Sequence, residues 1–304
     1  MRISTGVVTD DPAASAPIGS ELRLSAEMFP VDSLPGEHHV VDWDYFGGVL
    51  LQLKFIGQNK VYVHGSAVLV APGVALAARH VIEPFYKFLL EGSVTLVCSG
   101  ISPSQLMLWK CKSFTYASDK SDIVIISLSY CSPLPPDNTF KMATISTRLP
   151  SVGEPLTMVG FTASELEFDR QDMKIPVSGD VRISVGTVTA SYPHGRDSVL
   201  MPGPTLEVAS SASGGMSGGP VFDRDGFLVG LISTSFGAGD HVGPAYTSLL
   251  WPALIVPIGE IWPSGLNFEG RTLLQFGKLC AIDRRDAIQQ VSDTQFRYTP
   301  WEKE

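Results

Sequence analysis

Short apolar runs of strand length, separated by turn residues, fill most of the chain beyond residue 45. Val, Ile and Leu dominate these runs, which are too short and too β-branched for a series of amphipathic helices. The 29 glycines and 22 prolines supply the punctuation between them. The runs form two series: 48–55, 60–70, 94–98 and 123–128, then 156–161, 181–190, 205–209, 220–222 and 227–233. This pattern predicts an all-β protein.

A proline-rich crossing separates the two series. Residues 131–138 carry three prolines, which stiffen a linker. We therefore predict two packed barrels or sandwiches, over residues 41–138 and 139–262. Residues 1–40 are rich in Pro, Ser, Ala and Asp and are interpreted as an N-terminal arm, and residues 263–304 as a C-terminal extension with a helix near 279–291.

Composition and charge exclude several classes of function. Hydrophobic residues make up 44% and charged residues 17% of the chain, so it has ample apolar surface for a core. The net charge of −9 argues against a nucleic-acid partner, since a surface that binds phosphates is basic. No apolar run approaches the ~20 residues that cross a bilayer, and no apolar leader opens the chain. We expect a cytoplasmic protein without membrane contact.

Neither a metal nor a cofactor is expected. Cys98, Cys111, Cys131 and Cys280 are scattered without the spacing of a zinc site, and we interpret them as free thiols. The sequence contains no phosphate-binding loop, dinucleotide-binding fingerprint or HExxH motif.

Three local patterns carry chemistry. The run GSAVLVAPGVALAARHV places His80 just after an apolar strand, SDIVIISL places Asp122 at the start of another, and SGGMSGGPVF places Ser217 in a glycine-rich turn. A serine hydroxyl attacks only if a base removes its proton, and histidine suits that role because its pKa lies near neutral pH. A carboxylate can then orient the imidazole, and the glycines allow backbone amides to converge on one point.

These residues closely resemble the active site of the chymotrypsin/trypsin-like serine proteases, in the family's order His, Asp, Ser. The resemblance spans roughly residues 50–251 and implies two packed six-stranded Greek-key β-barrels. It assigns Ser217 as nucleophile, His80 as general base and acid, and Asp122 as orienting carboxylate. The amides of Gly215 and Ser217 would form the oxyanion hole. Ser233 would support the aspartate, and the stretch Ser233, Thr234, Ser235 would pair with a substrate strand.

The sequence departs from the secreted members of that family at three positions. Met216 stands where those enzymes carry the Asp that pairs with a newly cut N-terminus, so we expect no activation by N-terminal insertion. Val81 replaces a disulfide cysteine beside the histidine, which fits an intracellular relative. Arg79 replaces a small residue, and the sequence suggests no role for it.

The specificity pocket is less defined. By family spacing its floor lies near Ser211 and Ala212, and without an Asp there we expect a small, neutral pocket. His241 follows the strand that should form one wall, where it could contact an acidic or amide side chain or be a surface residue. Asp119 is a rival for the orienting carboxylate, but Asp122 directly abuts the apolar strand.

The sequence therefore predicts a serine endopeptidase of narrow specificity that acts on a protein or peptide substrate. Two alternatives stay open. One is a binding module on a protease fold, and the other is a protease that is inactive until a partner switches it on. The arm and the extension are candidate docking segments for such a regulatory partner.

Overall fold

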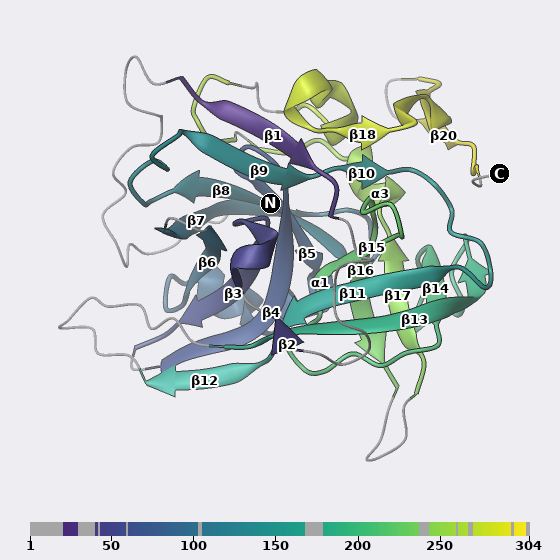
Figure 1. Ribbon diagram of the computed structural model, residues 1–304, viewed down its shortest axis with the longest axis horizontal. Helices are drawn as coiled ribbons and strands as arrows, with labels where there is room; N and C mark the ends of the chain where they lie inside the picture. The colour runs from purple at the N-terminus through teal and green to yellow at the C-terminus, as the bar shows by residue number, and fades with distance from the viewer. Residues whose placement is uncertain are drawn as a thin grey trace.

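The chain folds into two closed six-stranded antiparallel barrels packed side by side (Figure 1). The computed structural model describes residues 21–29, 40–41, 43–58, 60–102, 105–167, 179–236, 243–259, 261–266, 270–292 and 295–301. The predicted all-β double-barrel fold is confirmed.

The first barrel has the strand order β4-β3-β6-β7-β8-β5 and closes through pairing of β4 with β5. Its strands are β3 (Leu50–Ile56), β4 (Lys60–Ala71), β5 (Val74–Ala78), β6 (Thr95–Ser102), β7 (Gln105–Tyr116) and β8 (Ile123–Tyr130). Three short helical segments, α1 (Arg79–Ile82), η3 (Glu83–Phe85) and α2 (Tyr86–Leu90), join β5 to β6.

The second barrel has the order β15-β11-β13-β14-β17-β16 and closes through β15 and β16. Its strands are β11 (Pro155–Phe161), β13 (Val181–Tyr192), β14 (Thr205–Val208), β15 (Pro220–Phe222), β16 (Leu228–Ser235) and β17 (Ala245–Leu249). The short helix α3 (Trp251–Leu254) follows β17.

Burial on both faces explains why several strands have continuous apolar sequences. Along β5, Val74 and Leu76 belong to the apolar cluster between the barrels, whereas Ala75 and Ala77 belong to the interior of the first barrel. Side chains alternate across a strand, so a strand covered on both sides needs an apolar residue at every position. β8 alternates in the same way, with Ile125 in the shared cluster and Ile126 in the barrel.

Several segments pack outside the barrels. β1 (Arg23–Glu27) runs parallel to β9 (Thr139–Ala143) (Figure 1). Phe29 is buried, and its ring contacts those of Phe46 and Phe222. β12 (Ser164–Glu167) follows β11 of the second barrel in the chain but pairs with β4 of the first barrel. The remaining short elements are β2 (Val40–Val41), η2 (Trp43–Phe46) and β10 (Ile145–Ser146).

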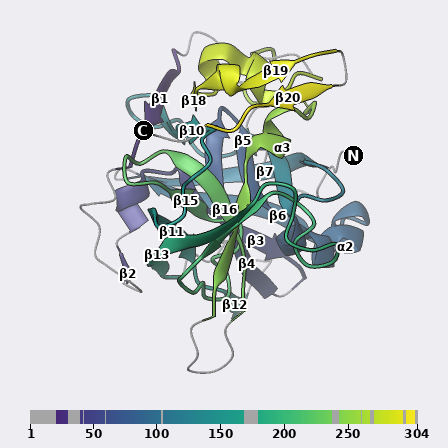
Figure 2. The ribbon, with the colours of Figure 1, turned by 90° about the vertical axis from the view of Figure 1, so that its right-hand side faces the viewer.

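The helix predicted near residues 279–291 is wrong. The extension contains the 3-10 segments η4 (Leu273–Leu279) and η5 (Arg285–Ala287), with β18 (Ile282–Asp283), β19 (Ile288–Gln290) and β20 (Phe296–Tyr298) (Figure 2). Arg285 donates to the carbonyls of Leu273, Leu274, Gly277 and Cys280. These bonds tie Arg285 to the carbonyl groups of η4 and to that of Cys280, and pairing of β18 with β10 holds the segment to the second barrel.

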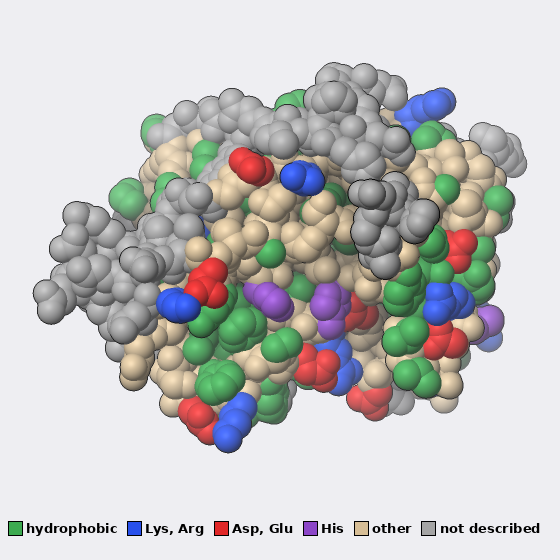
Figure 3. Space-filling view, turned by 90° about the horizontal axis from the view of Figure 1, so that it is seen from below, with side chains coloured by type: hydrophobic (Ala, Val, Ile, Leu, Met, Phe, Trp, Pro, Cys, Tyr) green, Lys and Arg blue, Asp and Glu red, His purple; other side chains and the backbone are tan. Residues whose placement is uncertain are grey.

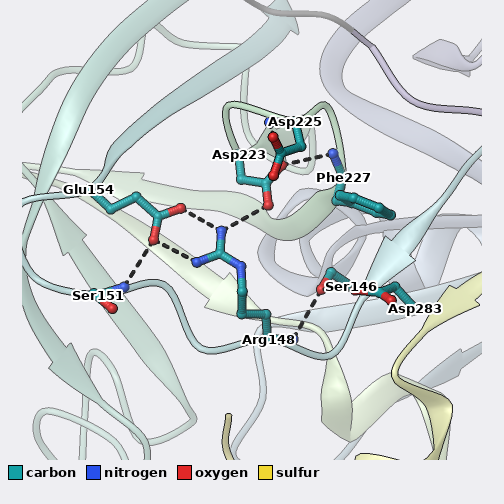
Figure 4. A network of polar contacts seen from close by, with 8 residues as sticks. All are labelled: Ser146, Arg148, Ser151, Glu154, Asp223, Asp225, Phe227 and Asp283. Carbon is teal, nitrogen blue, oxygen red and sulfur yellow. Dashed lines mark hydrogen bonds and ion pairs between the residues drawn. The ribbon is translucent and has the colours of Figure 1, made fainter. Parts of the chain in front are cut away.

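A buried ionic network joins the segment that follows β10 to the turn between β15 and β16 (Figure 4). The guanidinium of Arg148 donates to both carboxylate oxygens of Glu154 and, at 2.8 Å, to Asp223. Asp223 also accepts the backbone N–H of Phe227 at 2.9 Å, which closes the β15–β16 turn. The network therefore fixes the hairpin that follows the glycine-rich turn of Ser217.

Candidate active site

The pairing of β5 with β8 brings His80 and Asp122 together. Ala78 lies opposite Ile123, so the end of β5 and the start of β8 are adjacent. His80 follows in α1, and Asp122 directly precedes β8. The Nδ1–H of His80 donates to Oδ2 of Asp122 at 2.8 Å, and the backbone N–H of His80 donates to Oδ1 at 3.0 Å. The carboxylate therefore fixes both the ring and its backbone.

The electrostatic environment of His80 favours its protonated form. Burial alone lowers the pKa of the imidazole, but the hydrogen bond and charge of Asp122, with the charge of Glu83, outweigh burial and raise it above 6.5. Ser233 of β16 donates its hydroxyl to Oδ2 of Asp122, so the second barrel contributes to the same carboxylate.

Arg79, for which the sequence suggested no role, braces the turn that carries His80. Its guanidinium lies 4.4 Å from the centre of the Tyr116 ring and donates to Glu83 at 3.2 Å. A third contact, at 3.5 Å, reaches the carbonyl of Asp119. Arg79 thus links α1 to the loop before Asp122.

The turn around Ser217 requires glycine at two positions. Gly215 and Gly218 have φ of 93° and 82°, a region that L side chains rarely adopt. A Cβ on Gly215 would lie 2.1 Å from the N atom of Ala163, and one on Gly218 would lie 2.3 Å from the carbonyl oxygen of Ser66. Gly215 is therefore needed for close packing against the residue that precedes β12, and Gly218 for close packing against β4, as well as for the turn itself.

Hydrogen bonds leave two amides of this turn available. Gly218 donates to the carbonyl of Ile232 at 2.7 Å, and Met216 donates to that of Ser213 at 3.1 Å. The N–H groups of Gly215 and Ser217 have no acceptor within the described part of the chain. Because Ala163 donates to the carbonyl of Gly214 at 2.8 Å, the planar peptide directs the N–H of Gly215 away from Ala163.

Met216 and Ser66 hold the turn in place. The Met216 side chain is fully buried in the interior of the second barrel, and its sulfur accepts the N–H of Ser213 at 3.3 Å. The buried Ser66 hydroxyl donates to the carbonyl of Gly215 at 2.9 Å and accepts the N–H of Phe161 at 2.8 Å. Packing and hydrogen bonds therefore hold this turn in place.

The Ser217 hydroxyl donates to the carbonyl of Ser233 at 3.2 Å. Its own carbonyl accepts the N–H of Ser66 at 2.9 Å. Ser217 thus stands where β4 of the first barrel meets β16 of the second. Figure 3 shows one face of the molecule, near the centre of which histidine side chains lie close to acidic side chains.

A cavity of about 330 Å³ opens next to His80. Ser233 and Thr234 line it on one side, and the exposed apolar side chains of Val199, Leu200 and Phe236 on another. The sequence analysis missed these three residues, because an isolated apolar residue in a loop carries no functional signal.

The loop that presents Val199 and Leu200 is organised by Asp197. Oδ1 of this carboxylate accepts the N–H groups of Val199, Leu200 and Met201 at 2.9, 2.6 and 3.3 Å. These bonds lower the pKa of Asp197 to about 2. The carboxylate is therefore ionised at neutral pH and holds the loop in one conformation.

The other residues predicted to bind substrate differ in their relation to the cavity beside His80. Ser211 and Ala212 are half-buried in the segment before the turn and do not line the cavity beside His80. Ser233, Thr234 and Ser235 end β16, whose pairing with β15 stops at Leu231. His241 lies outside the described residues.

The described residues contain no group of three His, Cys, Asp or Glu side chains that could hold a metal. Within the same residues, no helix is long and apolar enough to span a bilayer. All four cysteines are free, and burial raises the pKa of Cys111 and of Cys280 to about 12.

Comparison with protein-family models identifies one family. The family model of the trypsin-like peptidase domain matches residues 65–231, more than half of the chain. Among solved structures, an inactive serine-to-alanine variant of Rv3671c from M. tuberculosis is similar, with 13% identity, TM-score 0.44, and coverage of 74% of this chain and 90% of that one. The HtrA-type protease AlgW with a tripeptide has 14% identity, TM-score 0.44, and coverage of 67% and 56%. No curated protein matches the sequence significantly.

The two closed barrels define a chymotrypsin-like double-barrel fold. The matched residues run from the middle of β4 to the middle of β16 and so include parts of both barrels and the glycine-rich turn. The chain belongs to the family of trypsin-like peptidases, and its class is that of a protease that hydrolyses protein substrates.

Proposed function

We propose that this protease is a serine endopeptidase whose nucleophile, base and orienting carboxylate are Ser217, His80 and Asp122. One observation carries the proposal. The Ser217 hydroxyl lies within a turn that has two unpaired amides, while the imidazole of His80 is fixed by Asp122 through Nδ1. That tautomer leaves the Nε2 lone pair free to accept a proton.

The reaction follows from these positions. The Ser217 hydroxyl turns from the Ser233 carbonyl to Nε2 of His80 and attacks the peptide carbonyl, as its proton moves to the imidazole. The N–H groups of Gly215 and Ser217 donate to the oxyanion. His80 then protonates the leaving amine, and an acyl-enzyme remains. Water attacks the acyl carbonyl as His80 takes its proton, the bond from Ser217 Oγ to the acyl carbon breaks, and His80 returns the proton to Ser217 as the carboxylic acid leaves.

Substrate binding uses the open edge of β16. Beyond Leu231, Thr234 and Ser235 pair with β17, Ser233 lies at the register shift beside them, and none of the three pairs with β15. We propose that the other edge of this stretch accepts an extended peptide. Ser211 and Ala212 would give a small, neutral pocket for the side chain before the scissile bond. Because Met216 already holds the turn by packing, we propose activity without cleavage at the N-terminus.

Labelling with a fluorophosphonate probe tests the proposal. We expect the native chain to be labelled, Ser217→Ala not to be, and His80→Ala to be labelled at a rate reduced by at least a hundredfold. Ser99→Ala, which removes the hydroxyl of a buried serine in the first barrel, should retain labelling. A folded native chain that resists the probe would favour a binding module. If labelling then appeared with a partner from the cell, a partner-dependent protease would be the better account.

A further inference from the structure

The edge of β4 that faces the second barrel is occupied almost along its whole length. At one end, β12 pairs with it from Lys60 to Val63. At the other end, the N–H of Ser66 bonds Ser217, and from Ala67 the strand pairs with β5. Between these partners only His64 and Gly65 are left.

This interval is short. His64 stands in the register of neither β3 nor β12, and its side chain is exposed. At about 3.4 Å per residue, two residues span about 7 Å of edge. Ser217 forms one boundary of the interval, and Ser164, opposite Val63, forms the other.

A substrate that passes Ser217 must use this interval for its leaving part. The hydroxyl of Ser217 is hydrogen-bonded to Ser233 of β16, and its carbonyl is hydrogen-bonded to Ser66 of β4. If the acyl part of the substrate pairs with the end of β16, an extended chain continues past Ser217 along β4. It then meets the start of β12, which already occupies the edge in antiparallel register.

β12 is held firmly enough to act as a boundary. Four consecutive residue pairs join it to β4, and the exposed ion pair of Glu165 with Lys60 adds little to this pairing. The residue just before it, Ala163, donates to the carbonyl of Gly214 in the turn of Ser217. The boundary and the amides beside the nucleophile therefore belong to one continuous segment.

We propose that β12 closes the leaving-group end of the cleft, so that a substrate pairs with β4 through no more than two residues after the scissile bond. The proposal rests on the serine endopeptidase function above. It assigns as substrates polypeptides whose chain turns away from the sheet after the second residue beyond the scissile bond.

Cleavage of a peptide series tests this proposal. The peptides share one acyl part, selected from a combinatorial library, and end one, two, three, four or six alanines after the scissile bond. We expect kcat/KM to rise at least fivefold from one to two residues and to change less than twofold from two to six. A further rise of fivefold or more at three or four residues would overturn the proposal.

A matched pair of variants locates the effect in β12. The backbone N–H groups of consecutive strand residues point to opposite sides, so one of the two at Glu165 and Leu166 points toward β4. The double variant Glu165→Pro, Leu166→Pro removes both N–H groups and therefore removes the one that bonds β4. This variant should gain kcat/KM with lengths beyond two residues, whereas Glu165→Ala with Leu166→Ala should keep the native profile. An unchanged plateau in a proline variant that the fluorophosphonate labels at the native rate would contradict the proposal. Cleavage of no peptide, with no labelling, would instead contradict the endopeptidase function itself.

Discussion

The Ser66 hydroxyl connects the first barrel to the carbonyl of Gly215, whose N–H is one of the two unpaired amides. Ser66→Ala removes the buried hydroxyl that bonds that carbonyl and the N–H of Phe161, at a cost of about 1–3 kcal/mol. We expect the turn to lose its orientation and fluorophosphonate labelling to slow at least tenfold, in a protein that still folds by circular dichroism.

Ser99→Ala is the matched control for this change. Ser99 is also a buried serine of the first barrel, but its hydroxyl has no partner among the described residues. It should label at the native rate. Equal labelling of the Ser66 and Ser99 variants would show that Ser66 does not position the turn.

The charge of Glu83 should affect the pH profile through His80. Neutral His80 is the form that accepts the proton, so activity falls as the pH drops through its raised pKa. Glu83→Gln removes one of the charges that raise this pKa, and the acidic limb of the labelling rate should move to lower pH. Glu91→Gln, in the same helical region but paired with Lys87, should leave the limb in place. A shift toward higher pH in the Glu83 variant would be inconsistent with this account.

At the scale of elements, the loop held by Asp197 should govern recognition of the acyl part. Asp197→Ala removes the acceptor of three N–H groups and frees Val199 and Leu200. We expect kcat/KM for peptides with an apolar acyl part to fall about tenfold, with unchanged labelling by a small phosphonate. Asp197→Asn keeps one acceptor oxygen and should lie near the native value. If both variants cleaved such peptides normally, the loop would have no part in recognition.

How much of the structure could be predicted depended on whether its signal was local. His80, Asp122 and Ser217 each sit in a short motif next to an apolar strand, and β5 and β8 have the continuous apolar sequence that burial on both faces requires. Ser66 acts through Gly215, 149 residues away, and no local pattern marks such a contact. The predicted helix near 279–291 failed because Arg285 and β10 satisfy backbone groups that a helix would have used.

At the scale of the whole molecule, Phe29 ties the N-terminal region to η2 and to the second barrel. Its ring contacts Phe46 and Phe222, and its N–H donates to the carbonyl of Gly226 at 3.1 Å. We expect Phe29→Ala to lower the free energy of unfolding by about 3–5 kcal/mol in urea denaturation. Met28, its neighbour, is 52% exposed, and Met28→Ala should cost less than ~1 kcal/mol. Equal losses in the two variants would mean that Phe29 contributes little beyond its exposed neighbour.

The apolar cluster between the barrels has a consequence for how the molecule moves. Val70 and Leu76 of the first barrel and Ile183 and Leu231 of the second are all buried in it. Swinging one barrel away from the other would expose this cluster to water, at about 25 cal/mol for each Å². Hinge motion between the two barrels is therefore energetically unfavourable. We expect the enzyme to admit its substrate by rearrangement of surface loops, while the two barrels stay packed together.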